Sequence, residues 1–227
     1  MTGLMDAPGR VRPGQVSILL LGRVIIGDIA VTLVDLAQRG LLTVEPADGD
    51  DWLLTPKASA AAAWALNYER KLLAGLAHAG TPAPLSSLVP GFGRPMDEAR
   101  SEIVRSATHH GWVHHLHHDL RTSAGTELGA QVRAFRRDLR RGMPERGQDV
   151  AAGPLLPYAL RFGLVTDDEI PLVRFAHACV RALVREPGWA PPEPARRPDD
   201  EAVITLHTSA DTDRHNAAMM MLAFGVF

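Results

Sequence analysis

The most regular pattern of apolar and polar positions lies in residues 27–39 and predicts an amphipathic helix over Gly27–Arg39. Its apolar residues at helical spacing are Ile29, Leu33 and Leu36. Asp28 stands where a first-turn acid favours the start of a helix, and Gly40 stands where a left-handed glycine commonly ends one. Apolar residues at the same spacing begin near Gln15, so a shorter helix is predicted before this one.

After Gly40 the pattern changes to short runs typical of β-strands. Strands are predicted at Leu41–Glu45 and Trp52–Thr55, because the residues between them, Pro46–Asp51, are rich in turn formers. Two helices, a glycine and a hairpin in this order are typical of a winged helix-turn-helix. In that arrangement Gly27–Arg39 takes the recognition-helix position and the hairpin is the wing.

Residues 67–126 repeat this order as helix, short helix, helix and strand. Helices are predicted at Tyr68–His78, Leu85–Val89 and Met96–His110, and a strand is predicted from Gly111. We therefore predict a mainly α fold with short β-hairpins, made of two tandem winged-helix-like units and a helical C-terminal segment. The predicted divisions are 14–66 for the first unit, 67–126 for the second, 127–186 for the helical segment and 187–227 for a Pro-rich linker and apolar tail.

The helical segment carries three predicted helices, at Glu127–Arg141, Leu155–Leu164 and Ile170–Arg185, with a loop over 142–153. Cys179 and His177 are not expected to form a catalytic dyad, because residues two apart on a helix do not face each other. Cys179 is predicted to be a packing residue, and His177 is predicted to be a core histidine because it shares an apolar stripe with Val173 and Val180. Tyr158 is predicted to be packed with its hydroxyl bonded to the backbone.

Composition narrows the class of protein. The chain has 227 residues, is 46% hydrophobic and 22% charged, and carries a formal net charge of −2. These values exclude wholesale disorder and a membrane bundle, and they argue against a whole-surface nucleic-acid binder. The single cysteine excludes an intramolecular disulfide and a multi-cysteine zinc site. The cysteine content favours the cytoplasm, where thiols stay reduced. Since no apolar stretch approaches the roughly 20 residues that span a bilayer, we also expect a soluble protein without membrane attachment.

Four segments carry a family resemblance: VTLVDLAQRGLLTVE (31–45), YERKLLAGL (68–76), the pair Arg100 and Ile103 leading to HGWV (110–113), and LPYALRFGL (156–164). In this order they resemble the cytoplasmic C-terminal region of a family of predicted bacterial membrane proteins of unknown function, over residues 14–165. The resemblance implies a fold but no chemistry, and we do not expect the family's membrane attachment to carry over. A weaker resemblance, L-x-D-L-A-x-x-G ahead of a hairpin, is to Golgi-phosphoprotein-like lipid-binding proteins.

Five polar residues are expected on the exposed face of the recognition-position helix: Asp28, Thr32, Asp35, Gln38 and Arg39. Two of them are acidic, and the predicted wing is acidic as well. Carboxylates at these positions would be repelled by the phosphates of DNA. We therefore predict that this face binds a protein or peptide partner. A scaffold with no ligand on this face is the competing interpretation.

The segment ATHHGWVHHLHHDL (107–120) is rich in histidine. If residues 113–119 form a strand, His115 and His117 share one face and become candidate ligands for a divalent metal such as Zn²⁺. The alternatives are an exposed His-rich hairpin that holds no metal and a pH-sensitive contact. No other cofactor is predicted.

The predicted helix Glu127–Arg141 bears the main cluster of basic residues: Arg133, Arg136, Arg137, Arg140 and Arg141. They form a candidate anion-binding face, because guanidinium groups pair with phosphates and carboxylates in bidentate geometry. A solvated helix face, with its arginines paired to nearby carboxylates, is the competing interpretation.

The function predicted first is a non-catalytic, winged-helix-like binding module that holds a protein or peptide. The second hypothesis is a DNA-binding transcriptional regulator that uses the Arg-rich helix, with nucleic acid ranked below protein as a partner. The third is a metal-dependent enzyme of a biosynthetic pathway built on the histidine cluster. The Met-rich tail near the C-terminus is a candidate surface for a homodimer.

Overall fold

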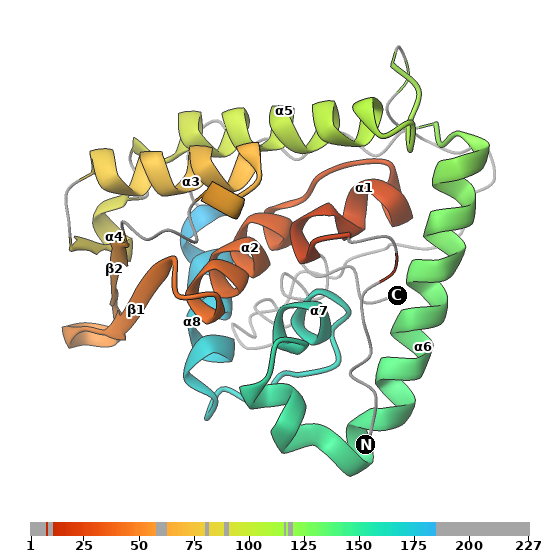
Figure 1. The fold of residues 1–227 in the computed structure, drawn as a ribbon. Helices are drawn as coiled ribbons and strands as arrows, with labels where there is room; N and C mark the ends of the chain where they lie inside the picture. The colour runs from red at the N-terminus through yellow and green to blue at the C-terminus, as the bar shows by residue number, and fades with distance from the viewer. Residues whose placement is uncertain are drawn as a thin grey trace, which may run out of the picture.

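The fold is mainly helical with one small three-stranded antiparallel sheet, as the hydrophobic pattern predicts at this coarse level. It is a computed structural model that describes residues 8, 11–57, 63–79, 82–88, 91–115, 117 and 120–184. The predicted linker and tail at 187–227 lie outside these residues. Figure 1 shows the elements, which are α1 (Val16–Leu21), α2 (Ile26–Gln38), β1 (Leu42–Pro46), β2 (Trp52–Pro56), α3 (Asn67–His78), β3 (Ala83–Pro84), α4 (Leu85–Leu88), α5 (Gly93–His109), α6 (Ser123–Ala152), α7 (Leu156–Arg161) and α8 (Pro171–Leu183).

Helix α2 lies in the middle of the molecule (Figure 1) and packs against α7, α8, β1 and the turn that precedes α1. Every residue over 26–36 is buried, so the helix is enclosed on all sides instead of presenting a polar face to water. Its start is capped by the Asp28 carboxylate, which accepts a 2.8 Å hydrogen bond from the backbone N–H of Ile25. It ends at Gln38, shortly before Gly40, whose φ of 71° reverses the chain.

The predicted hairpin is confirmed, and a third strand extends it. In β1 and β2 Leu42 lies opposite Pro56. The edge strand β3 lies between two predicted helices, and Pro84 is tolerated there because an edge strand has one unpaired side. The Asp51 carboxylate ties the hairpin to α4 by accepting hydrogen bonds from the hydroxyl and the backbone N–H of Ser86, at 2.5 and 3.1 Å.

Helices α3 and α5 lie side by side along one edge of the molecule (Figure 1). They approach closely at Gly75, where an added Cβ would lie 2.5 Å from the Cβ of Pro95. Helix α4 is a single turn that contacts β2 and α8. Where the structure describes the segment after Gly111, one antiparallel bridge between Val113 and Arg121 stands in place of the predicted strand.

Helix α6 is longer than the sequence pattern predicted. It runs for 30 residues, so the loop predicted over 142–153 is wrong. Buried positions continue beyond Arg141, because Val150 is buried in the same core as Val132 and Leu139. The Thr122 hydroxyl caps its start by accepting a 3.0 Å hydrogen bond from the backbone N–H of Gly125.

Buried apolar residues from all three predicted divisions within 14–186 belong to one hydrophobic core, which extends from Val11 to Leu183. The sheet also crosses a predicted division, because β3 of the second unit pairs with β2 of the first. Among the described residues, no helix has the length and apolar character that crossing a bilayer requires.

Candidate functional site

The residues predicted to bind a partner divide into two groups along α2. Asp28 and Thr32 are buried, so the expectation that they are exposed is wrong. The Thr32 hydroxyl donates a 2.6 Å hydrogen bond to the Asp28 backbone carbonyl one turn earlier. The Asp28 carboxylate lies 2.8 Å from the guanidinium of Arg161 on α7. These two side chains hold α2 in the core, where a partner cannot reach them.

Asp35, Gln38 and Arg39 lie together at the C-terminal end of α2. The Nη2 atom of Arg39 is 2.8 Å from Asp35 Oδ2 and 2.8 Å from Glu69 Oε1 on α3. Glu69 is fully buried, and its other carboxylate oxygen accepts a 2.8 Å hydrogen bond from the backbone N–H of Leu66. One guanidinium therefore joins two helices through two carboxylates.

A buried tyrosine and a second arginine lie beside this ion-paired cluster. Burial raises the pKa of the Tyr68 hydroxyl well above its usual value, the carboxylates of Glu69 and Asp35 raise it further, and Arg12 opposes them. Burial is also the main cause that raises the pKa of Asp35, with Arg39 opposing it. The Tyr68 hydroxyl is buried without a hydrogen-bond partner among the described residues.

The predicted packing of three C-terminal side chains is confirmed. The Tyr158 hydroxyl donates a 2.6 Å hydrogen bond to the backbone carbonyl of Val11. His177 is buried, and its Nδ1 atom lies 2.6 Å from Asp168 Oδ1. Cys179 is fully buried, and burial raises the pKa of its thiol far above the usual value. A thiol in this environment is a packing group and a poor nucleophile.

A groove, called here the α2 groove, opens from Asp35, Gln38 and Arg39 toward α8 and encloses about 1080 Å³. Its wall comes from the end of α6 and from the α7–α8 loop. The apolar side chains of that wall include Met143, Pro154, Leu164, Val165, Ile170 and Leu172. The exposed carboxylates of Asp167 and Glu169 stand at its rim.

Two residues that line the α2 groove each carry a buried polar atom without a hydrogen-bond partner among the described residues: Gln38 Oε1 and Arg39 Nε. The orientation of the Gln38 amide is fixed, because its nitrogen donates a 2.8 Å hydrogen bond to the backbone carbonyl of Gly153. A buried acceptor left unsatisfied costs about 1–3 kcal/mol. Three carboxylates line the groove against one guanidinium. The groove therefore suits a ligand that combines hydrogen-bond donors or a cation with apolar groups.

The sequence pattern missed two contributors to this site. Glu69 stands three residues into its helix, where an acid is commonly a cap, and nothing in the pattern shows that its second oxygen meets Arg39. The sequence pattern also does not identify the wall residues of the α7–α8 loop, because only the tertiary fold brings them close to α2. One sequence feature could have indicated this wall: between Leu164 and Leu172, apolar residues flank three consecutive acidic residues.

Among the described residues of the histidine segment, His114, His115 and His117 are exposed and lie in no strand, so the alternating strand on which the metal hypothesis depended is not seen at these positions. The His114 N–H donates to the Leu120 carbonyl at 3.0 Å, and the Leu120 N–H donates to the His117 carbonyl at 2.9 Å. Among the described residues no group of three or more His, Cys, Asp or Glu side chains is placed to hold a metal ion. His118 and Asp119 lie outside the described residues, so zinc binding here stays a prediction.

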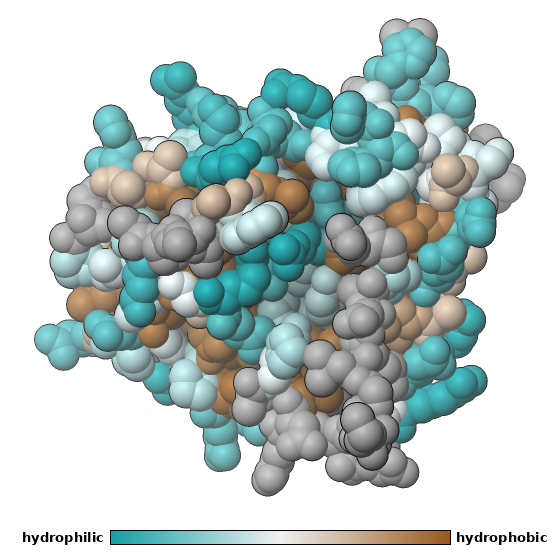
Figure 2. Space-filling view, in the orientation of Figure 1, coloured by the Kyte–Doolittle hydropathy of each residue, from teal (hydrophilic) through white to brown (hydrophobic). Residues whose placement is uncertain are grey.

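The arginines of α6 lie opposite its buried face, as the helical spacing predicted. Val132, Phe135 and Leu139 are buried, whereas Arg133, Arg137, Arg140 and Arg141 are exposed. Figure 2 shows hydrophilic side chains projecting from the edge that α6 forms in Figure 1. Arg136 is half-buried, and burial lowers its pKa with smaller contributions from Arg140 and Arg161.

Comparison with protein-family models, with curated protein sequences and with solved structures finds no match to this chain. The function of the α2 groove is therefore argued from its own geometry and chemistry.

Proposed function

We propose that this protein is a binding module that holds a peptide segment of a partner protein in the α2 groove. One observation carries the proposal: Gln38, whose buried Oε1 acceptor has no hydrogen-bond partner among the described residues, lines this groove together with a set of apolar side chains. Ligand sites commonly combine an apolar lining with a few placed polar groups in this way. Three of the five residues predicted to bind a partner line this groove: Asp35, Gln38 and Arg39.

The chemistry of the groove defines the segment that fits it. An arginine or lysine side chain would bring N–H donors to Gln38 Oε1 and a positive charge to Glu169 at the rim. Apolar side chains on either side would cover Leu164 and Leu172, which are half-buried in the unbound protein. A nucleic acid does not suit this face, because its phosphates would meet carboxylates.

We also propose that residues 14–66 and 67–126 are winged-helix-like units that position this groove. The order α1, α2, β1 and β2 supports the first assignment. The order α3, α4 and α5, followed by the bridge between Val113 and Arg121, supports the second. As part of the same proposal, we infer that the chain is related to the C-terminal region of the bacterial membrane-protein family. We also infer that the protein is located in the cytoplasm.

An array of short random peptides, probed with the full-length protein carrying no affinity tag, tests the function. We expect it to enrich peptides with one arginine or lysine between apolar residues. A fluorescent copy of the best peptide then gives the dissociation constant by titration. Glu169→Lys reverses the charge at the rim and should weaken binding by about tenfold or more.

The matched control is Asp48→Lys, which makes a similar charge reversal on an exposed residue of the hairpin, outside the groove. Binding by this variant should stay within about twofold of the unmodified protein. The proposal is overturned if the array enriches no sequence pattern, or if Asp48→Lys weakens binding as much as Glu169→Lys does.

A further inference from the structure

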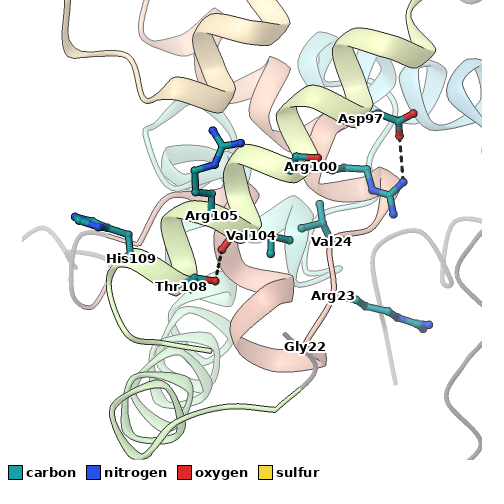
Figure 3. Close-up of a pocket in the computed structure, with 10 residues that line it drawn as sticks. Gly22, Arg23, Val24, Asp97, Arg100, Val104, Arg105, Thr108 and His109 are labelled. Carbon is teal, nitrogen blue, oxygen red and sulfur yellow. Dashed lines mark hydrogen bonds and ion pairs between the residues drawn. The ribbon is translucent and has the colours of Figure 1, made fainter. Parts of the chain in front are cut away.

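A second hollow lies between the α1–α2 connection and α5, and it shares no residue with the α2 groove. It encloses about 850 Å³. Figure 3 shows Val24 and Val104 together in its middle, with arginine side chains extending around them. We call it the basic hollow, after the basic residues that line it: Arg23, Arg100, Arg105 and His109.

Local structure explains why these side chains gather here. Helix α1 ends at Gly22, whose φ of 72° turns the chain and leaves Arg23 exposed beside the buried Val24. On α5, Arg100 and Val104 are one turn apart and therefore share a face. The hollow is thus a small apolar floor with guanidinium groups around it.

The charge of the basic hollow differs in sign from that of the whole chain. Its lining contains three arginines and a single acid, Asp97, whereas the chain carries a formal net charge of −2. Asp97 lies 3.3 Å from Arg100, and Glu102 pairs with Arg105. Each pair has one exposed member: the side chains of Asp97 and Arg105 are 68% and 70% exposed, and those of their partners Arg100 and Glu102 are 28% and 12% exposed. Ion pairs that water reaches from one side stabilise a protein modestly, so a phosphate that offers bidentate acceptors can compete with the carboxylates for the two guanidinium groups.

Basic side chains also lie where α1 meets α6. Helix α1 packs against both α5 and α6. Arg121 donates a 2.7 Å hydrogen bond to the Leu19 carbonyl at the C-terminal end of α1. The guanidinium nitrogens of Arg121 and Arg133 lie 3.9 and 3.7 Å from the point that a Cβ on Gly129 would occupy. The first arginine of α6, Arg133, therefore lies beside the end of α1, and Gly22 and Arg23 of the basic hollow directly follow that end.

We propose that the basic hollow and the α6 arginines, which flank the same end of α1, together bind the phosphate backbone of duplex nucleic acid. A row of arginines over two helices and a connecting segment matches an extended polyanion better than a single phosphate group. A bilayer surface would require apolar side chains for insertion, and the exposed large hydrophobic residues in the described part of the chain, Leu21, Trp64 and Leu120, do not line the hollow. The contacts are to phosphates, so binding is independent of base sequence.

Fluorescence anisotropy of a labelled random duplex, with tag-free full-length protein, tests this proposal. If four phosphates are neutralised, affinity should fall roughly 100-fold between about 50 and 200 mM salt. Arg23→Glu and Arg105→Glu should each weaken binding at low salt by about fivefold or more and reduce the salt slope by about 1. Both variants change exposed side chains, and their peptide binding in the α2 groove should be unchanged.

Arg181→Glu on α8 is the matched control, because it makes the same change at an exposed position outside both sites. It should leave the affinity and its salt slope as they are in the unmodified protein.

Four results would each overturn the proposal. The first is no binding at low salt, and the second is equal weakening by Arg181→Glu. The third is loss of binding in Arg137→Glu but not in Arg23→Glu or Arg105→Glu, which would assign binding to α6 alone. The fourth is sedimentation with vesicles containing phosphatidylserine that the duplex does not compete away, which would indicate a lipid surface.

Discussion

The Nε atom of Arg161 lies 2.8 Å from Asp28 Oδ1, and both side chains are buried. Arg161 Nε also lies 2.9 Å from the hydroxyl oxygen of Ser17, which donates a hydrogen bond to the same carboxylate oxygen. Burial raises the pKa of Asp28, and the charge of Arg161 opposes that rise. This cluster fastens α7 to α2 and to α1 in the interior of the molecule.

Breaking this ion pair should destabilise the fold strongly. Arg161→Met leaves the Asp28 carboxyl buried without its cation, and we expect the free energy of unfolding to fall by about 3–5 kcal/mol. Urea unfolding followed by circular dichroism measures the change.

A double-mutant cycle separates the pair from the packing around it. Asp28→Asn keeps an acceptor for the cap at Ile25 but removes the charge. Because each single variant leaves one group uncompensated, the double variant should lose at least about 1 kcal/mol less than the two single losses added together. Additive losses would show that the two side chains contribute independently.

Tyr158→Phe and Tyr68→Phe should have different effects, although each removes one hydroxyl from a tyrosine. The Tyr158 hydroxyl donates to Val11, and its loss should lower the free energy of unfolding by about 1 kcal/mol. The Tyr68 hydroxyl is buried without a hydrogen-bond partner among the described residues, so its removal should be neutral or stabilising. Urea unfolding of both variants checks the contrast, and an equal loss for Tyr68→Phe would contradict it.

Gly125→Ala should destabilise the protein by about 1–3 kcal/mol, because the new methyl group would overlap the backbone carbonyl of Trp112. A backbone group cannot turn away as a flexible side chain can. Gly91→Ala is the control, since a Cβ there meets nothing within 4 Å, and it should change stability little. Thermal unfolding of the two variants checks the difference, and equal midpoints would refute the close approach of α6 to Trp112.

Asp35 should give the stability a distinctive dependence on pH. Its pKa is raised above 3.8, mainly by burial, so the folded state binds the proton more tightly than the unfolded chain does. The stability that Asp35 contributes is therefore complete below pH 3.8 and is lost as the pH rises through the folded-state pKa. Relative to the unmodified protein, Asp35→Asn should become more stable as the pH rises through this window. Urea unfolding at a series of pH values measures this difference, and a flat or falling difference would be inconsistent with a raised pKa.

Helical periodicity predicted the position of α2 but not its surroundings. A polar residue among apolar ones is usually read as facing water, and Asp28 and Thr32 were assigned in that way. The residue that neutralises Asp28 stands 133 positions later in the chain. The available signal was Arg161 itself, a lone charge among the apolar residues of LPYALRFGL. An isolated charge in an apolar segment indicates a buried pair, but its partner becomes known only from the fold.

The end of α6 shows a different cause of error. The loop predicted over 142–153 contains Gly142, Pro144 and Gly147, which are residue types that commonly interrupt helices. The helix continues because Met143 and Val150 pack against the core beyond that point. Tertiary packing therefore outweighs local preference here, and the same extension brings Met143 to the α2 groove.

The separation of Asp28 from Arg161 also has a consequence for the order of events during synthesis. The ribosome must add 133 more residues after Asp28 before its cation exists. At 5–20 residues per second this takes roughly 7–27 s, whereas a single helix forms in microseconds or less. Throughout that interval the nascent α2 has its acid but not the arginine that neutralises it. The first half of the chain therefore stays incompletely packed until α7 has been synthesised. At this stage it would expose the most apolar surface to a holdase chaperone.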